Sequence, residues 1–79
     1  MRIKKELTVV RTSFIFGSNV GNYYLTDGET TYYWKTTSER AYEEMEEGTV
    51  HTCTFTDDDI EWFNPLNGET YRTIKNVRF

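Results

Sequence analysis

The chain has 79 residues and a mass of 9.4 kDa, enough for one small domain, which we expect to cover residues 1–79. Its 9 Lys and Arg residues face 13 Asp and Glu residues, giving a net charge of -4. Thr, Val, Ile, Tyr, Phe and Trp together supply 35 residues, and all six types favour strands. This composition excludes a helical bundle, a coiled coil, collagen and a disordered tail. So short a chain also leaves little to enclose a dry pocket, so we expect a non-enzymatic binding module without catalytic residues or cofactor.

The sequence shows no recognisable targeting signal, and we therefore expect a cytoplasmic protein with no membrane partner. No apolar stretch approaches the roughly 20 residues that a membrane span needs. The first six residues include basic side chains, but no apolar run follows, so they do not form a signal peptide. Cys53 is the single cysteine, so no internal disulfide can form.

The first predicted element is a long strand over residues 2–16. Ile3, Leu7 and Val9 share one parity, whereas the other parity is that of Val10, Thr12, Phe14 and Phe16. Side chains alternate faces along a strand, so the inward face must change near Val9 and Val10. A β-bulge or a strong bend is the simplest cause, and a turn or short loop over residues 17–22 follows.

Two short aromatic strands come next, at residues 23–26 and 30–36. Asp27-Gly28 lies between them and is a strong hairpin signal. We therefore expect these two strands to pair.

The pattern then changes to one helix over residues 39–47. The spacing of Thr36 and Glu39 fits a capping box, and Ser38 is an alternative N-cap. Gly48 supplies a C-terminal stop. The apolar stripe of this helix consists of Ala41, Tyr42 and Met45.

The remaining chain predicts two more strands. Residues 49–56 form the first. Residues 57–59 interrupt or follow it, and residues 60–63 extend it. Residues 64–68 are rich in turn formers, and residues 69–79 form the last strand. The order of strands and helix matches the five-stranded oligonucleotide/oligosaccharide-binding (OB) barrel, which has a helix between strands three and four. A small SH3-like barrel is the alternative.

Several motifs resemble short OB-like domains of bacteriophage and mobile-element proteins. The first is Asn-Tyr-Tyr-Leu-Thr-Asp-Gly at residues 22–28, followed by Tyr-Tyr-Trp-Lys-Thr-Thr-Ser at residues 32–38. Glu-Gly-Thr-Val-His at residues 47–51 and Tyr-Arg-Thr-Ile at residues 71–74 are similar to the later parts. The resemblance covers roughly residues 14–79. It implies an OB barrel and a link to nucleic-acid processing.

A first acidic cluster occupies the predicted helix. Without residues 39–47 the chain keeps 8 acids and 8 bases, so this segment carries the whole excess of negative charge. It is either a solvated helix face or a docking surface for a basic nucleic-acid-handling protein, such as a defence nuclease. Phage-encoded nuclease inhibitors, including anti-CRISPR proteins, are similar to this chain in their small size and acidity. The glutamates concerned are Glu39, Glu43, Glu44, Glu46 and Glu47.

A second acidic cluster consists of Asp57, Asp58 and Asp59, with Glu61 close behind. Three interpretations compete for it: a loop kept soluble by charge, a weak divalent-metal site, or a further part of the docking surface. The spacing does not fit an EF-hand, because Trp62 stands where that motif needs glycine.

The alternative function is binding of single-stranded nucleic acid. Aromatic rings would stack on bases, and Lys and Arg side chains would contact phosphates. The acidic net charge opposes this function, because phosphate binding gains from cations. The candidate residues are Tyr24, Tyr33, Trp34 and Tyr71 for stacking, and Lys5, Lys35, Arg72 and Lys75 for phosphates.

His51 and Cys53 are two residues apart on one predicted strand and so face the same side. They are possible zinc ligands, but further ligands would have to come from nearby carboxylates. Phe55 continues this face, which instead suggests that Cys53 is a buried thiol.

Overall fold

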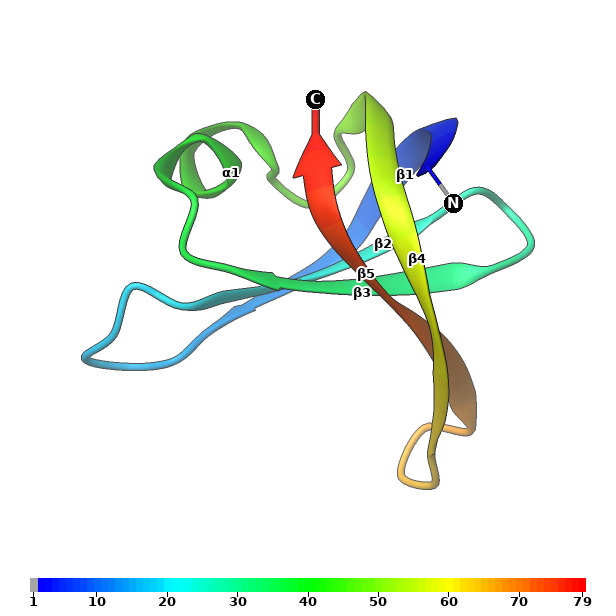
Figure 1. The fold of residues 1–79 in the computed structure, drawn as a ribbon. Coiled ribbons are helices and arrows are strands. Elements are labelled where there is room, and N and C mark those ends of the chain that lie inside the picture. Colours follow the sequence, from blue (N-terminus) through cyan, green and yellow to red (C-terminus); the bar gives the residue numbers. More distant parts are fainter. Residues whose placement is uncertain (1) are drawn as a thin grey trace.

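Five strands close into a barrel in the computed structural model, which describes residues 2–79 (Figure 1). The hydrogen-bonded order is β1–β2–β3–β5–β4, and β4 pairs with β1. Strands β3 and β5 are parallel, and the other pairs are antiparallel. This confirms the predicted OB-like barrel with one helix between the third and fourth strands. The elements are β1 (Arg2–Phe14), β2 (Gly21–Thr26), β3 (Thr31–Thr36), α1 (Glu39–Glu44), β4 (Val50–Asn64) and β5 (Glu69–Arg78).

The predicted bulge lies in the middle of β1. The pairing of β1 with β2 shifts between Val9 and Arg11, and Val10 is the extra residue. Leu7 and Val9 are buried before the bulge, whereas Val10 is exposed. The first half of β1 pairs with β4 and the second half with β2, so the bulge allows one strand to serve two parts of the barrel. The strand ends at Phe14, two residues before the predicted end.

The barrel interior is filled mainly by large side chains, as expected from the aromatic composition. The buried rings of Tyr32 and Phe55 lie 5.1 Å apart, and Ala41 and Met45 add the buried side of α1. In the part of the chain that the structure describes, no helix is long and apolar enough to cross a membrane. The buried core residues are Leu7, Val9, Tyr23, Leu25, Tyr32, Trp34, Ala41, Met45, Cys53, Phe55 and Ile74.

The helix α1 is shorter than predicted and ends three residues early. Ser38, rather than Thr36, is its N-cap, and its hydroxyl accepts a hydrogen bond from the backbone N–H of Ala41 at 3.3 Å. Met45 is fully buried and has non-helical angles (φ -90, ψ 67), so the backbone leaves the helix there. Gly48, at φ +89, then lies in the following turn instead of directly at the helix end.

The predicted hairpin of β2 and β3 forms, and Asp27 organises its turn. One carboxylate oxygen of Asp27 accepts hydrogen bonds from the backbone N–H groups of Glu29 (2.9 Å) and Thr30 (2.8 Å). The other oxygen pairs with the ammonium group of Lys5 at 2.7 Å. The hydrogen bond from Lys5 has the largest effect in holding the pKa of Asp27 well below its usual range, and the two N–H groups lower this pKa further.

This arrangement predicts a pH-dependent contribution of Asp27 to stability. A lowered folded-state pKa means that the contribution is complete above about pH 4, the unfolded-state value, and is lost as the pH falls toward the folded-state pKa. At pH 7 we expect Asp27→Asn to lower the free energy of unfolding by about 1 kcal/mol. Urea unfolding at pH 7 and pH 3 should show a smaller difference from wild type at pH 3. Glu29→Gln, at an exposed carboxylate of the same turn, is the control, and an equal loss for Asp27→Asn at both pH values would contradict the assignment.

Candidate functional site

One side chain from each of the five strands contributes to an aromatic cluster outside the barrel core. We call this cluster the aromatic face. Arg11 on β1 pairs with Tyr24 on β2, which pairs with Tyr33 on β3. Their side chains point outward because the neighbouring residues of β2 and β3 fill the core. The members of the aromatic face are Arg11, Tyr24, Tyr33, Trp62 and Tyr71.

The rings of the aromatic face contact one another in a continuous series. Tyr24 lies 5.3 Å from Tyr33 and 5.0 Å from Tyr71, measured between ring centroids. Trp62 lies 4.7 Å from Tyr71 and 6.1 Å from Tyr33. The guanidinium group of Arg11 lies 4.2 Å from the centroid of Tyr24, within range of a cation–π interaction. The face therefore presents aromatic rings and a positive charge together.

Tyr71 is the buried member of the aromatic face, and its hydroxyl joins several strands by hydrogen bonds. Its side chain is fully buried, and its hydroxyl donates a short hydrogen bond to the carboxylate of Glu69. The same hydroxyl accepts hydrogen bonds from Arg11 at 3.2 Å and from the amide of Asn67 at 2.9 Å. These contacts join β1 to the β4–β5 hairpin and hold Arg11 beside the rings.

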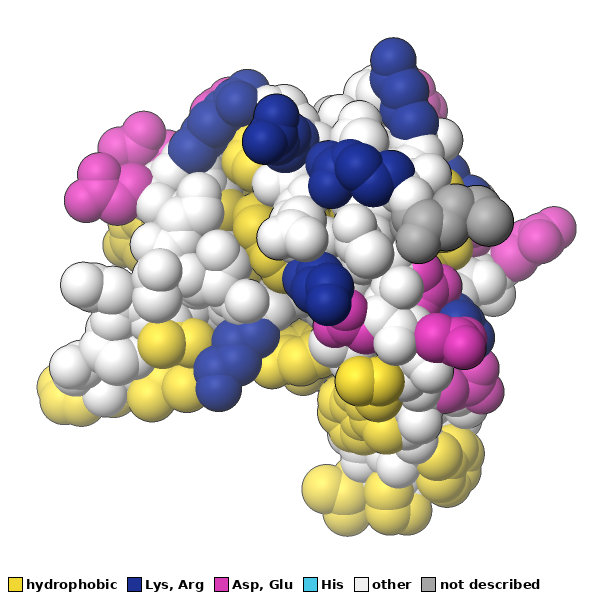
Figure 2. Space-filling view, viewed as in Figure 1, with side chains coloured by type: hydrophobic (Ala, Val, Ile, Leu, Met, Phe, Trp, Pro, Cys, Tyr) yellow, Lys and Arg dark blue, Asp and Glu magenta, His cyan; other side chains and the backbone are white. Residues whose placement is uncertain are grey.

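Two uncharged hairpin tips project on either side of the barrel. Residues 14–21 and 62–68 contain no charged side chain, and both carry exposed apolar residues. Figure 2 shows these hydrophobic side chains on the two lower projections, with a recess between them. The exposed apolar residues are Phe14, Ile15 and Phe16 on the first tip, and Trp62, Phe63 and Leu66 on the second.

The structure separates the four predicted stacking residues into two pairs. Tyr24 and Tyr33 lie on the aromatic face and are partly exposed. Trp34 points into the core, because it has the opposite parity to Tyr33 on β3, and Tyr71 is buried beneath its neighbours. Trp34 and Tyr71 therefore offer no surface to a base. Trp62, which sequence reasoning missed, is 37% exposed and takes their place.

Of the four cations predicted to contact phosphates, one is unpaired in the described part of the chain and three form ion pairs. Lys35 is exposed and makes no ion pair within residues 2–79. Lys5 is paired with Asp27, and Arg72 and Lys75 are paired with acids of β4. Arg11, which was not predicted, joins Lys35 on the outer side of β1–β3. The expected alternation of side chains after the bulge could have identified it.

Each carboxylate of the second acidic cluster pairs with a cation of β5. The guanidinium group of Arg72 pairs with Asp57 and Asp59, each at 2.9 Å, and with Glu61 at 3.0 Å. Arg72 lowers the pKa of Asp57 by this hydrogen bond. Lys75 pairs with Asp58 at 3.1 Å. Residues 57–59 therefore do not form an open array of carboxylates.

The three aspartates continue β4 instead of ending it. Asp57 accepts a hydrogen bond from the backbone N–H of Asp59 at 2.8 Å, and Asp59 has a positive φ of 58. The pairing with β5 shifts between Asp57 and Ile60 at this point. Aspartate tolerates this conformation because its side chain can bond to the local backbone.

The first acidic cluster remains exposed. Arg40 pairs with Glu44 at 2.7 Å, and Glu47 accepts a hydrogen bond from the backbone N–H of Thr12 at 3.2 Å. The glutamates at 39, 43 and 44 belong to α1, whereas those at 46 and 47 lie in the turn that follows. The predicted helical row of five acids is thus divided between two backbone segments.

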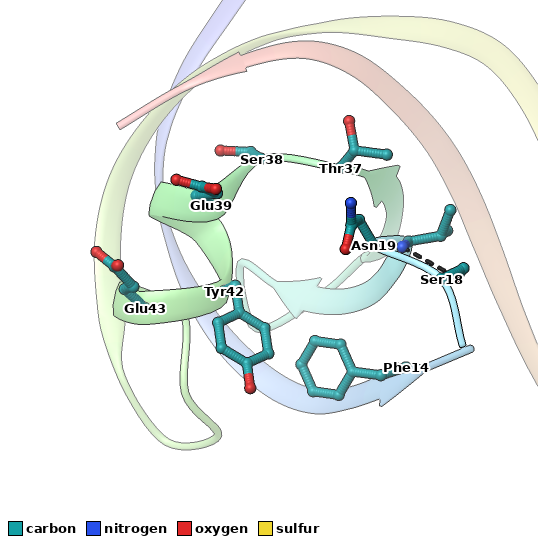
Figure 3. A pocket seen from close by; sticks show the side chains of 9 residues that line it. Phe14, Ser18, Asn19, Thr37, Ser38, Glu39, Tyr42 and Glu43 are labelled. Carbon is teal, nitrogen blue, oxygen red and sulfur yellow. Dashed lines mark hydrogen bonds between the residues drawn. The ribbon is translucent and has the colours of Figure 1, made fainter. Parts of the chain in front are cut away.

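A groove of about 610 Å³ separates α1 from the tip of the β1–β2 hairpin (Figure 3). Phe14 and Tyr42 meet edge to face at 5.3 Å, and both line the groove. Glu39 and Glu43 line it from α1. Tyr42 was predicted on the buried stripe, but it is 67% exposed because only Ala41 and Met45 of the stripe reach the core. The groove thus combines aromatic rings with carboxylates.

His51 and Cys53 lie on β4, where burial raises the pKa of the Cys53 thiol to about 11. The imidazole of His51 shares a hydrogen bond with the hydroxyl of Thr49 at 2.9 Å and meets the ring of Phe79. Across residues 2–79, no three His, Cys, Asp or Glu side chains lie close enough together to hold a metal ion. The buried-thiol interpretation of Cys53 is confirmed.

Comparisons of the chain with protein-family models, with curated proteins and with solved structures find no match. Two arrangements are relevant: the aromatic face with its cations, and the acidic groove beside α1.

Proposed function

We propose that the chain is a non-enzymatic module that binds single-stranded nucleic acid on the aromatic face. The observation that supports this proposal is the pair of partly exposed tyrosines, Tyr24 and Tyr33, with Arg11 beside them and Lys35 close by on β3. OB barrels bind oligonucleotides on the face of strands two and three, between the loops that join strands one to two and four to five. The aromatic face occupies the corresponding position here.

The energetics favour base stacking over recognition by charge alone. An aromatic ring contributes about 1–3 kcal/mol per stacked base, whatever the base. The net charge of -4 resides in residues 39–47, so the rest of the surface is neutral overall and repels phosphates little. Residues 14–21 and 62–68 add apolar walls without adding negative charge.

Titration with a four-nucleotide oligothymidylate at low salt tests this proposal. We expect tryptophan fluorescence to be quenched at micromolar protein, because Trp62 lies on the aromatic face while Trp34 is buried. Trp62→Phe, which keeps a ring, should remove most of the quenching but leave binding of a fluorescein-labelled oligonucleotide intact. An absence of both quenching and binding in the wild-type protein would refute the proposal.

The second candidate is an acidic docking module for a basic nucleic-acid-handling protein, as in phage inhibitors of defence nucleases, including anti-CRISPR proteins. The groove beside α1 favours it, because Phe14 and Tyr42 can hold the apolar part of a Lys or Arg side chain while Glu39 and Glu43 balance its charge. In an anisotropy titration with a labelled hexa-arginine peptide in place of the oligonucleotide, wild type should bind the peptide and Glu39→Gln/Glu43→Gln should not.

Both candidate functions fit a cytoplasmic protein, because a free thiol such as Cys53 stays reduced in the cytoplasm.

A further inference from the structure

A second group of cations gathers on another part of the barrel wall. Figure 2 shows Lys and Arg side chains across the upper half of the molecule, over β1, β4 and β5. We call the four cations that β1 and β5 contribute there the basic face. Strand pairing sets them in two rows, Lys4–Thr54–Arg78 and Arg2–Thr56–Lys75.

The rows of the basic face follow from strand alternation on β1 and from an irregularity on β5, where the pairing register shifts between Thr54 and Thr56 and Asn76 has a positive φ of 53. Arg2 and Lys4 are exposed, whereas Ile3 between them packs against the core. On β1 the two rows lie about 6.6 Å apart, which is the length of two strand residues. Threonine hydroxyls on β4 lie between the cations of β1 and those of β5. A charged strip of this kind suits a polyanion with regularly repeated charges.

Three of these cations are free to bind such a ligand. Within residues 2–79, Arg2, Lys4 and Arg78 form no ion pair, whereas Lys75 pairs with Asp58. Arg2 donates a hydrogen bond to the backbone carbonyl of Asn76 at 3.2 Å, which fixes it beside β5. The excess of negative charge lies in residues 39–47, whereas the closure of the barrel brings these basic residues from the two ends of the chain together.

The strand β1 connects the two faces. Arg11 on the aromatic face and Lys4 on the basic face are seven residues apart on it, one of them the bulged Val10, which gives about 20 Å along the strand. OB barrels cover about 4–16 nucleotides, so one strand of nucleic acid can span both faces. We propose that the basic face binds the sugar–phosphate backbone of the strand whose bases stack on the aromatic face. This inference rests on the proposed function and adds a length-dependent site to it.

The test compares fluorescein-labelled oligothymidylates of 4 and 16 nucleotides by anisotropy over a range of salt concentrations. Each phosphate contact contributes about 0.7 to the slope of log K against log salt for single strands. For the 16-mer, Arg2→Gln/Lys4→Gln/Arg78→Gln should lower the magnitude of the slope by about 2. The 4-mer, which the aromatic face alone accommodates, should show no change. Arg2→Lys/Lys4→Arg/Arg78→Lys is the charge-conserving control and should keep the wild-type slope.

The outcomes separate the two proposals. If the 4-mer binds and the neutralised variant keeps the wild-type slope with the 16-mer, the basic face is not a backbone site. If the neutralised variant loses affinity for phosphatidylserine vesicles but not for the 16-mer, its ligand is a lipid surface and the inference is overturned. If the slope with the 16-mer falls while loss of Tyr24 and Tyr33 has no effect, the basic face stands and the proposed stacking site fails.

Discussion

Replacing both Tyr24 and Tyr33 by alanine is expected to weaken binding of the four-nucleotide oligothymidylate by at least about 30-fold. Each ring removed costs about 1–3 kcal/mol of stacking energy, and 1.4 kcal/mol corresponds to a tenfold change in affinity. Both rings are partly exposed and lie 5.3 Å apart, so two neighbouring bases can use them together. Anisotropy of a labelled oligonucleotide measures the change directly and does not depend on Trp62.

Tyr24→Phe/Tyr33→Phe is the matched control for this experiment. It keeps both rings and removes only the hydroxyls, one of which donates a hydrogen bond from Tyr33 to Asn22 at 2.5 Å. We expect its affinity to stay within about threefold of wild type, because stacking uses the ring face. Equal losses in the alanine and phenylalanine variants would indicate that the hydroxyls, and not the rings, carry the interaction.

Replacing Phe55 by alanine is expected to lower the free energy of unfolding by about 3–5 kcal/mol. The side chain is fully buried and packs against Tyr32. A domain of this size has a total stability of only about 4–12 kcal/mol, so the loss brings the variant close to unfolding. Urea unfolding followed by circular dichroism measures the change.

Phe63→Ala is the control for the core substitution, because it removes the same ring from the same strand. Phe63 is 60% exposed at the tip of the β4–β5 hairpin, and we expect a change within about 0.5 kcal/mol. Similar destabilisation by the two substitutions would mean that the hairpin tip is packed in the folded protein. A loss at Phe55 alone supports the division into a closed core and exposed tips.

Features that depend on neighbouring residues could be predicted from the sequence. Asp27-Gly28 specified the β2–β3 hairpin, and the change of parity near Val10 located the bulge of β1. The end of α1 was misplaced because Gly48 is a local stop signal. The actual end depends on Met45 reaching a core that other strands supply.

The sequence by itself determined the class of fold, the order of its elements and the aromatic character of its core, because alternation and turn chemistry act over a few residues. Only the tertiary structure decided which rings and charges reach the surface. Strand register left Tyr33 outside and Trp34 inside, and the closure of β5 on β4 placed Arg72 against three carboxylates. These outcomes depend on contacts between residues far apart in the chain, and such contacts are set by barrel closure and not by local preference.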